Sequence, residues 1–164
     1  MFVLAYLSLS ITVAGYSPGA REAIKLAYSR ADLAVAQRDV LGMYALDAPD
    51  FTELYERHWL DLVSRRRETK TFFTCRPSLT QTTAIRLVIV HGTRAVVIAR
   101  RHQEYTIGYG SVGALPPETP NIQHIHAQIE TVAEDKWRKT GSEWLRVRSR
   151  PLSHKAAFTM SAIR

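Results

Sequence analysis

Two adjacent side chains of opposite charge, Arg38 and Asp39, are the first residues of the sequence that could do chemistry. Arg38 falls near the middle of an otherwise apolar helical arc, where a buried charge needs a charged partner or a wet cavity. In such a cavity a guanidinium could hold an anionic group. The same pair also suits a structural role, either as an ion pair at a helix end or as a hydrogen bond to the loop that follows.

Two imidazoles, His124 and His126, could bind a metal ion. They lie two residues apart in a segment with strand character, so both side chains point to the same side. Glu130 shares that face of the strand. An exposed polar sheet face explains all three residues as well, and we expect no metal ion and no cofactor.

The sequence contains no recognisable nucleophile motif. Its serines form no Gly-x-Ser-x-Gly elbow, and Cys75 is the single cysteine, with no base identified beside it. One cysteine can form neither an intrachain disulfide nor a Cys/His zinc site. We expect Cys75 to be an inert thiol and His91, in a predicted turn, to face solvent.

The composition indicates one globular domain. The chain has 164 residues, of which 46% are hydrophobic and 23% charged, and it carries a net charge of +7. The basic residues gather at positions 65–70 and 138–155, which favours anionic partners. No helix-turn-helix, phosphate loop or aromatic RNA-binding sheet accompanies them, so nucleic acid is not the expected partner and solvated faces explain the clusters.

The first fourteen residues, MFVLAYLSLSITVA, are uncharged and mostly apolar. A secretory signal peptide has such a region, although the positively charged start of a signal peptide is missing. A membrane span needs about 20 apolar residues, so we expect no stable span. Residues 1–16 are therefore either a signal peptide of an exported, periplasmic or secreted protein, or an apolar segment that packs on a cytoplasmic domain.

A long helix is predicted from Ser17 and Pro18 to about Leu46. The hydroxyl of Ser17 can accept a backbone hydrogen bond at the helix start, and the fixed φ of Pro18 suits the first helical position. Apolar residues then recur on one arc at helical spacing: Ile24, Ala27, Tyr28, Ala31, Ala34, Val35 and Leu41. The many alanines imply a close approach to whatever the helix covers. Residues 47–50 predict a turn, residues 51–57 a short strand, and residues 60–73 a second helix.

From Thr80 onward the chain is rich in β-branched residues and predicts an antiparallel meander. Residues 80–90 and 95–107 form its first hairpin, with Gly92 in the tight turn. Residues 108–120 form a Gly- and Pro-rich loop, residues 122–138 and 142–150 a second hairpin, and residues 151–164 a weakly ordered tail. Helices followed by antiparallel strands are the α+β pattern, with one domain over residues 17–150.

Strand alternation sorts the third long strand into two faces. One face, expected to lie toward the long helix, carries Ile125, Ala127, Ile129, Ala133, Asp135 and Trp137. The opposite face carries His124, His126, Gln128, Glu130 and Glu134. We expect the indole of Trp137 to fill the core and the carboxylate of Asp135 to tie the hairpin. A β-bulge would reverse the assignment beyond it.

The chain resembles the nuclear transport factor 2-like superfamily, in its SnoaL-like or calcium/calmodulin-kinase-association-like branch. The resemblance spans about residues 20–150 and rests on the segment QRDVLGMYALDAPDF, the helix after it, and the closing hairpin VAEDKWRKTGSEWLRVRSR. It implies a cone-shaped, cystatin-like α+β fold, in which a curved antiparallel sheet wraps around the long N-terminal helix. It further implies an apolar cavity open at one end and a homodimer formed through the outer sheet face.

Enzymes of this superfamily, such as ketosteroid isomerases and scytalone dehydratases, place Asp, His, Tyr or Arg in the cavity. Asp39, Asp135, Tyr28 and Arg38 supply the residue types of a base, a second carboxylate, a donor and an anion clamp. No motif matches any of those enzymes residue by residue, so the resemblance assigns no catalytic residue.

The expected function is non-catalytic binding of a small, largely apolar ligand, with an acidic group attracted by Arg38. The candidate ligand-binding residues are Tyr28, Arg38, Asp39, Asp135 and Trp137. One alternative is an enzyme that catalyses isomerisation, dehydration or cyclisation with Asp39 or Asp135 as general base. The other is an interaction module whose basic sheet holds an acidic protein partner.

Overall fold

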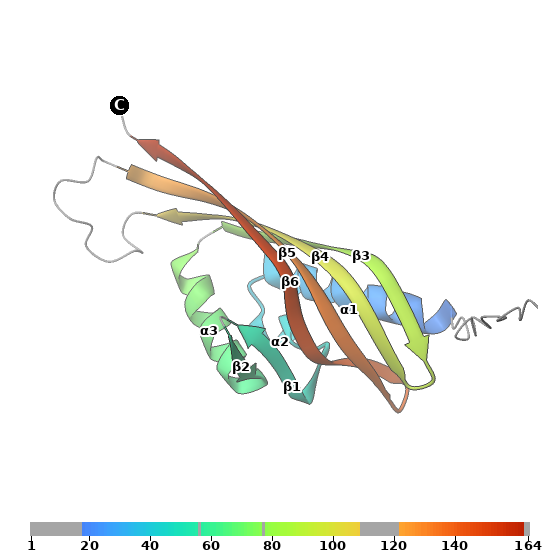
Figure 1. Ribbon diagram of the computed structural model, residues 1–164. Coiled ribbons are helices and arrows are strands. Elements are labelled where there is room, and N and C mark those ends of the chain that lie inside the picture. Colours follow the sequence, from blue (N-terminus) through green and yellow to red (C-terminus); the bar gives the residue numbers. More distant parts are fainter. Residues whose placement is uncertain (1–17, 56, 77, 109–121, 163–164) are drawn as a thin grey trace, which may run out of the picture.

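The computed structural model describes residues 18–55, 57–76, 78–108 and 122–162 (Figure 1). Residues 1–16, interpreted above as a signal peptide or apolar segment, lie outside the described residues, as does most of the loop expected at 108–120. The elements are α1 (Pro18–Ala36), α2 (Val40–Met43), β1 (Asp47–Tyr55), β2 (His58–Asp61), α3 (Leu62–Cys75), β3 (Ser78–His91), β4 (Arg94–Gly108), β5 (Ile122–Thr140) and β6 (Glu143–Ala162).

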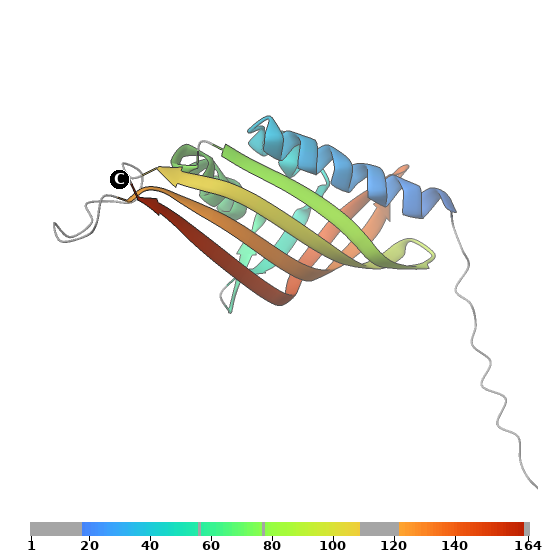
Figure 2. The same cartoon turned by 90° about the horizontal axis from the view of Figure 1, so that it is seen from above.

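Six strands form one sheet in the order β2-β1-β6-β5-β4-β3. All neighbours are antiparallel except β1 and β6, which run parallel, so the sheet is mixed. The long strands curve, and α1 runs alongside β3 in both views (Figures 1 and 2). The predicted α+β cone architecture is therefore confirmed, with the difference that one strand pair is parallel.

The main core lies between α1 and the middle strands. Ile24, Tyr28 and Val35 of α1 are buried, and they meet small or β-branched residues of the sheet such as Val97 and Ala99. Small side chains on both surfaces let the helix approach the sheet closely. The edge of β3 is also tied to α1, because Asp32 accepts a hydrogen bond from the backbone N–H of Thr83 at 2.7 Å.

The first helix ends earlier than predicted, at Ala36 rather than near Leu46. Arg38 takes a left-handed conformation, with φ of 60°. The N–H of Arg38 donates to Val35 at 3.0 Å and that of Asp39 to Ala34 at 2.8 Å, which is the Schellman pattern of a helix C-terminus. Glycine usually occupies the left-handed position, and the arginine here gave no such signal in the sequence.

The turn predicted at residues 47–50 is also corrected, because these residues begin β1. The buried Asp47 lies opposite Arg146 of β6 in the parallel pairing. The predicted second helix is present as α3. It begins where Asp61 accepts a hydrogen bond from the backbone N–H of Ser64 at 2.8 Å.

The tail expected from Pro151 onward instead forms the second half of β6. It continues to pair with β5 from Ala133↔Pro151 to Ile122↔Ala162. The pairing of β1 with β6 ends at Ser149. Beyond that residue β6 is an edge strand, where a proline is tolerated because one side of the strand needs no ladder hydrogen bond.

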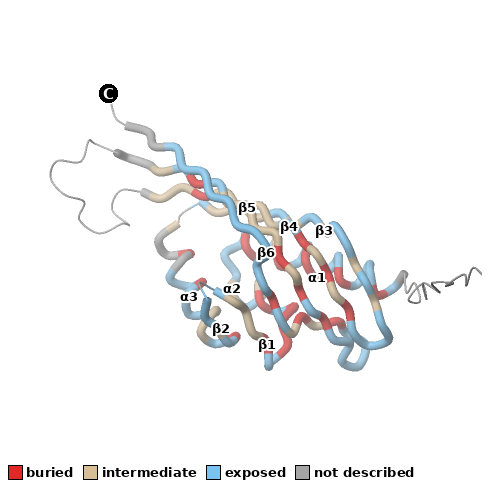
Figure 3. The backbone as a smooth tube through the Cα atoms, in the orientation of Figure 1, coloured by how far each residue is buried: buried red, intermediate tan, exposed pale blue. Residues whose placement is uncertain are grey.

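The predicted faces of β5 are confirmed. Ala127, Ala133, Asp135 and Trp137 are buried, whereas His126 and Gln128 are exposed, and buried and exposed residues alternate along the strands in Figure 3. The register shifts leave Arg86 of β3 and both Val147 and Leu152 of β6 without partners. Because these inserted residues lie on the neighbouring strands, the alternation of β5 itself continues unbroken from His124 to Thr140.

Candidate ligand-binding cavity

A buried polar cluster lies between α1 and the sheet. The side chain of Asp135 has no exposed surface, and it accepts hydrogen bonds from the hydroxyl of Tyr28 and from Arg101. The Nη1 atom of Arg146 lies 3.6 Å from the same carboxylate. The ring of Tyr28 also meets that of Trp137 edge-on, with centroids 5.2 Å apart. Three of the five predicted site residues are therefore brought together: Tyr28, Asp135 and Trp137.

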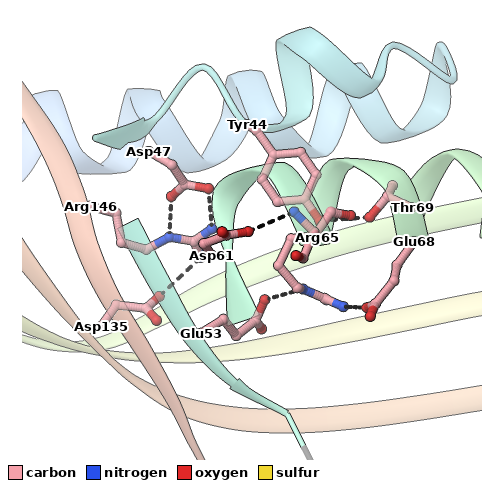
Figure 4. Close-up of polar contacts among 10 residues, drawn as sticks. Tyr44, Asp47, Glu53, Asp61, Arg65, Glu68, Thr69, Asp135 and Arg146 are labelled. Carbon is pink, nitrogen blue, oxygen red and sulfur yellow. Dashed lines mark hydrogen bonds and ion pairs between the residues drawn. The ribbon is translucent and has the colours of Figure 1, made fainter. Parts of the chain in front are cut away.

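Asp47 completes the cluster on the β1 side. It accepts two hydrogen bonds from Arg146, from Nε to Oδ1 at 2.6 Å and from Nη2 to Oδ2 at 3.1 Å (Figure 4). The cluster thus contains two carboxylates and two guanidinium groups, and its formal charge is balanced. Such compensation is what allows charged groups to be buried.

The electrostatics of the cluster keep Asp135 ionised. Burial acts to raise the pKa of Asp135, but the guanidinium groups of Arg101 and Arg146 outweigh it and hold the pKa below its ordinary value. Burial, together with the negative charge of Asp135, raises the pKa of Tyr28. The hydroxyl of Tyr28 therefore keeps its proton. Burial also raises the pKa of Asp47, despite the opposing effect of Arg146.

The other two predicted site residues, Arg38 and Asp39, do not join this cluster. Both are exposed in the turn between α1 and α2. The guanidinium of Arg38 donates a hydrogen bond to the carbonyl of Phe73 near the end of α3. Asp39 lies directly before α2, and a Cβ placed on Gly42 would lie 2.3 Å from its Oδ2. A ligand contact by any of the five residues stays a prediction.

A cavity of about 990 Å³ lies between α3, β1 and the inner face of the long strands. Its apolar walls include Leu54, Phe73, Leu79, Tyr105 and Ile129. The strand pair Gln103↔Ile129 lines it, and the next inward-facing pair is Arg101↔Thr131. The side chain of Arg101 is 13% exposed and reaches Asp135, so the buried cluster lies next to the cavity on the side toward the β3–β4 turn.

Three guanidinium groups line the cavity, those of Arg65, Arg67 and Arg76. Arg65 is already compensated, since it contacts Glu53 at 2.6 Å and Glu68 at 2.7 Å (Figure 4). Arg76 lies over the ring of Tyr105, 4.7 Å from its centroid. No described residue forms an ion pair or hydrogen bond with the side chain of Arg67. The cavity therefore combines an apolar body with positive charge that is only partly compensated.

The sequence patterns did not identify these cavity residues. Arg65, Arg67 and Arg76 belong to or follow a helix whose basic residues were interpreted as a solvated face. His154 lines the cavity and shares a 3.0 Å hydrogen bond between its Nδ1 and the hydroxyl of Thr131, but it lies in the segment expected to be a tail. The one available signal was the cluster of arginines at 65–67.

The described part of the chain contains no group of three or more His, Cys, Asp or Glu side chains arranged to hold a metal ion. His126 is exposed on the outer sheet face, and the side chains of His124 and Cys75 lie outside what the structure describes. No helix within the described ranges is long and apolar enough to cross a bilayer.

No protein-family model matches the chain, and no curated protein is significantly similar to it in sequence. Solved structures do share its fold. A conserved protein from Planctomyces limnophilus superposes with a TM-score of 0.67 at 14% identity, covering 83% of this chain and 100% of that one. A hexachlorocyclohexane dehydrochlorinase from Novosphingobium barchaimii gives 0.65 at 13% identity, with coverage of 88% and 92%.

A nuclear transport factor 2-like protein of unknown function from Pseudomonas putida superposes with a TM-score of 0.53 at 15% identity, covering 84% of this chain and 88% of the other. At these identities the likeness concerns the fold. The resemblance stated from the sequence is confirmed at that level.

Proposed function

We propose, starting from a nuclear transport factor 2-like fold, that the chain binds a small, largely apolar molecule with an acidic group in the cavity beneath α3. The observation that carries this proposal is the cavity itself, an apolar hollow of about 990 Å³ with guanidinium groups on its wall. Sites for small molecules typically have about 300–1,000 Å³, mostly apolar walls and a few polar groups that fix orientation.

The walls are suited to a flat or aliphatic body. Leu79 of β3, Tyr105 of β4 and Ile129 of β5 face α3 from the sheet, and Phe73 faces them from the helix. Burial of apolar ligand surface against such side chains is favourable by roughly 25 cal/mol per Å². We assign orientation of the ligand to the positive charge, because an acidic group would be drawn to Arg67 rather than to Arg65, which already contacts Glu53 and Glu68.

The test measures binding of the dye anilinonaphthalene sulfonate, which combines an aromatic body with an anionic group. Binding is detected as an increase in the fluorescence of the dye. Ile129→Trp fills the cavity and should abolish the fluorescence increase. The neighbouring substitution Gln128→Trp adds the same side chain to the outer face and should leave binding unchanged. Decanoate should displace the dye more effectively than decanol, and Arg67→Gln should remove that difference. Equal binding by the two tryptophan variants at equal melting temperature would contradict the proposal.

A second candidate is proton-transfer catalysis, favoured by the imidazole of His154 in the cavity. Asp135 is poorly suited as a general base, because its pKa lies below the ordinary value and a base works best near the operating pH. One structural neighbour eliminates hydrogen chloride from hexachlorocyclohexane, as its name states, so release of chloride from that compound is a direct test. A binding domain releases none. Turnover that is lost in His154→Gln would establish the enzyme instead.

A homodimer through the outer sheet face is part of the proposal. Leu87 and Ile89 of β3 are 48% and 43% exposed, and Val96 and Ile98 lie beside them on β4. Exposed apolar patches of this kind often mark interfaces. Light scattering after size exclusion should give twice the mass of the chain, and Ile89→Glu should halve it, whereas Thr82→Glu on the same strand should not. A monomeric wild-type chain at micromolar concentration would rule out the dimer.

A further inference from the structure

The outer half of β6 is an open edge of the sheet. The pairing with β1 ends at Ser149, and from Arg150 to Ala162 no described strand pairs with the other side of β6. This stretch, the free edge, lies at the margin of the sheet in Figure 2, and every residue from Pro151 to Thr159 is exposed. The backbone N–H and C=O groups along such an edge can pair with a further strand.

The remaining edges of the sheet in the described part of the chain offer less. The edge strand β2 has only four residues. At the opposite margin α1 runs alongside β3, and Asp32 accepts a hydrogen bond from the backbone N–H of Thr83. Natural proteins shorten or cover their edge strands in this way to prevent pairing between molecules. The free edge of β6 is long and has no such cover among the described elements.

The sequence of the free edge is compatible with a second copy of itself. Two copies that pair antiparallel along the whole free edge are centred on its midpoint, Ala156. In this register Ser153 lies opposite Thr159 of the other copy, and Lys155 lies opposite Ala157. A register centred on Lys155 would instead place two ammonium groups directly opposite each other, which is destabilising. The single charge of this stretch therefore favours the register with small residues at its centre.

The inner faces of the two sheets also continue into each other in this register. His154 and Phe158 point to the inner face, because they lie opposite Thr131 and Ala127 of β5. The ring of Phe158 is 59% exposed, and His154 lines the cavity. The partner subunit's Phe158 would lie opposite His154 and extend the cavity wall. Aromatic pairs of this kind stabilise neighbouring strands.

We infer that two copies of the chain pair antiparallel through the free edge of β6, with Ala156 at the two-fold axis. This contact is distinct from the outer-face dimer proposed above, which uses Leu87 and Ile89 of β3. One strand pair buries less surface than the about 1,200 Å² of a stable complex, so association requires roughly 0.1–1 mM protein. That concentration lies above the micromolar range in which the outer-face dimer is tested.

The experiment is disulfide trapping in the full chain at submillimolar concentration. Cys75→Ala removes the single native thiol, and Ile89→Glu removes the outer-face contact. Ala156→Cys should then form a covalent dimer on mild oxidation, because directly opposite Cα atoms lie about 4.5–5.5 Å apart, within the range of a disulfide. The matched control is Ala157→Cys. Its two copies lie diagonally, about 7–8 Å apart, and should cross-link at least roughly tenfold more slowly.

A second substitution tests the register through charge. In the Ala156→Cys chain, Ala157→Glu should speed cross-linking at low salt, because the new carboxylate faces the partner subunit's Lys155, and Ala157→Lys should slow it. Equal rates for Ala156→Cys and Ala157→Cys at equal melting temperature would overturn the inference, since they would indicate random collision. A failure of Ala156→Cys to cross-link, or equal rates for the two charge variants, would also overturn it.

Discussion

Asp135 shows how a single residue organises the interior of this protein. Its carboxylate is buried among Tyr28, Arg101 and Arg146, so it replaces the water it lost on folding with charged and hydrogen-bonding partners. Removing one member of such a cluster leaves the others buried and uncompensated, which costs more than the cluster itself contributes. The energetic role of Asp135 can therefore be measured separately from any role in binding.

Asp135→Asn should lower the free energy of unfolding by about 3–5 kcal/mol, because Arg101 would then bury positive charge without a counterion and Arg146 would keep only Asp47. Tyr28→Phe should cost about 1.5–3 kcal/mol, the usual range for a hydrogen bond to a charged group. Urea unfolding measures both. The exposed pair of Arg150 and Glu134 is the control, and Glu134→Gln should change stability by less than about 1 kcal/mol. A comparable loss of stability in all three variants would show that the buried cluster contributes no more to the free energy of unfolding than the exposed pair does.

Backbone strain at one exposed position gives a second prediction. Arg57 has a φ of 73° in the turn between β1 and β2, a conformation that costs a non-glycine residue about 1–2 kcal/mol. Arg57→Gly should raise the free energy of unfolding by about 0.5 kcal/mol after the entropy cost of glycine. Gly141→Ala, at a φ of 60°, should lower it by about 1 kcal/mol. A lower melting temperature for Arg57→Gly would contradict this account.

Sequence patterns predicted only some of the residues of the buried cluster and the cavity. Periodicity of three to four on α1 and of two on β5 was enough to place Tyr28, Asp135 and Trp137 on inward faces. It could not supply Arg101 or Arg146, because their proximity depends on which strands are neighbours and in what register. The cavity arginines of α3 were missed for a similar reason, since a basic helix face gives no sign of what packs opposite it.

At the scale of elements, β6 is the strand that joins the two parts of the sheet. Its first half lies between β1 and β5, and its second half pairs with β5 alone. Pro151 indicated an end of structure in the sequence, yet it falls where β1 stops pairing and the missing N–H is harmless. The order of α1, β1, α3 and the four long strands was predictable from the sequence, whereas the short elements α2 and β2 and the length of β6 were not.

A chain that ends at Arg150 should be much less stable than the full 164-residue chain. The truncation removes the partner of β5 from Ile122 to Ala133 and leaves a long open strand edge. It also removes Pro151 and His154 from the cavity wall, so dye binding should fall together with stability. Circular dichroism on heating and dye fluorescence measure the two effects. Unchanged melting of the shorter chain would show that the second half of β6 contributes nothing to the fold.

At the scale of the whole molecule, we expect low pH to unfold the chain. Hydrogen bonds from Arg138 lower the pKa of Asp50, those from Arg100 lower the pKa of Glu130, and the pKa of Asp135 is also lowered. A carboxylate with a lowered pKa binds fewer protons in the folded state, so it stabilises the fold above its ordinary pKa. That stability is lost as the pH falls through the lower, folded pKa. Asp47 acts in the opposite direction because burial raises its pKa.

We therefore expect a steady melting temperature from neutral pH down to about pH 5 and a progressive fall below about pH 4.5, measured by scanning calorimetry. The variant Asp135→Asn should start from a lower melting temperature and lose less of it over the same acidic range. Parallel curves for the variant and the wild type would show that Asp135 is not among the groups responsible.

The unpaired Leu152 has a consequence for how this chain can tolerate change. Each residue of an extended strand faces the side opposite to its neighbours, so the single insertion at Leu152 sets the orientation of everything that follows it. If Leu152 instead paired with Val132, every later residue of β6 would move by one position along β5, so the ammonium of Lys155 would turn into the hollow and the imidazole of His154 would turn out to solvent. Deletion of Leu152 would remove the bulge and preserve the existing pairings, so His154 would stay opposite Thr131 and both surfaces of the strand end would be kept.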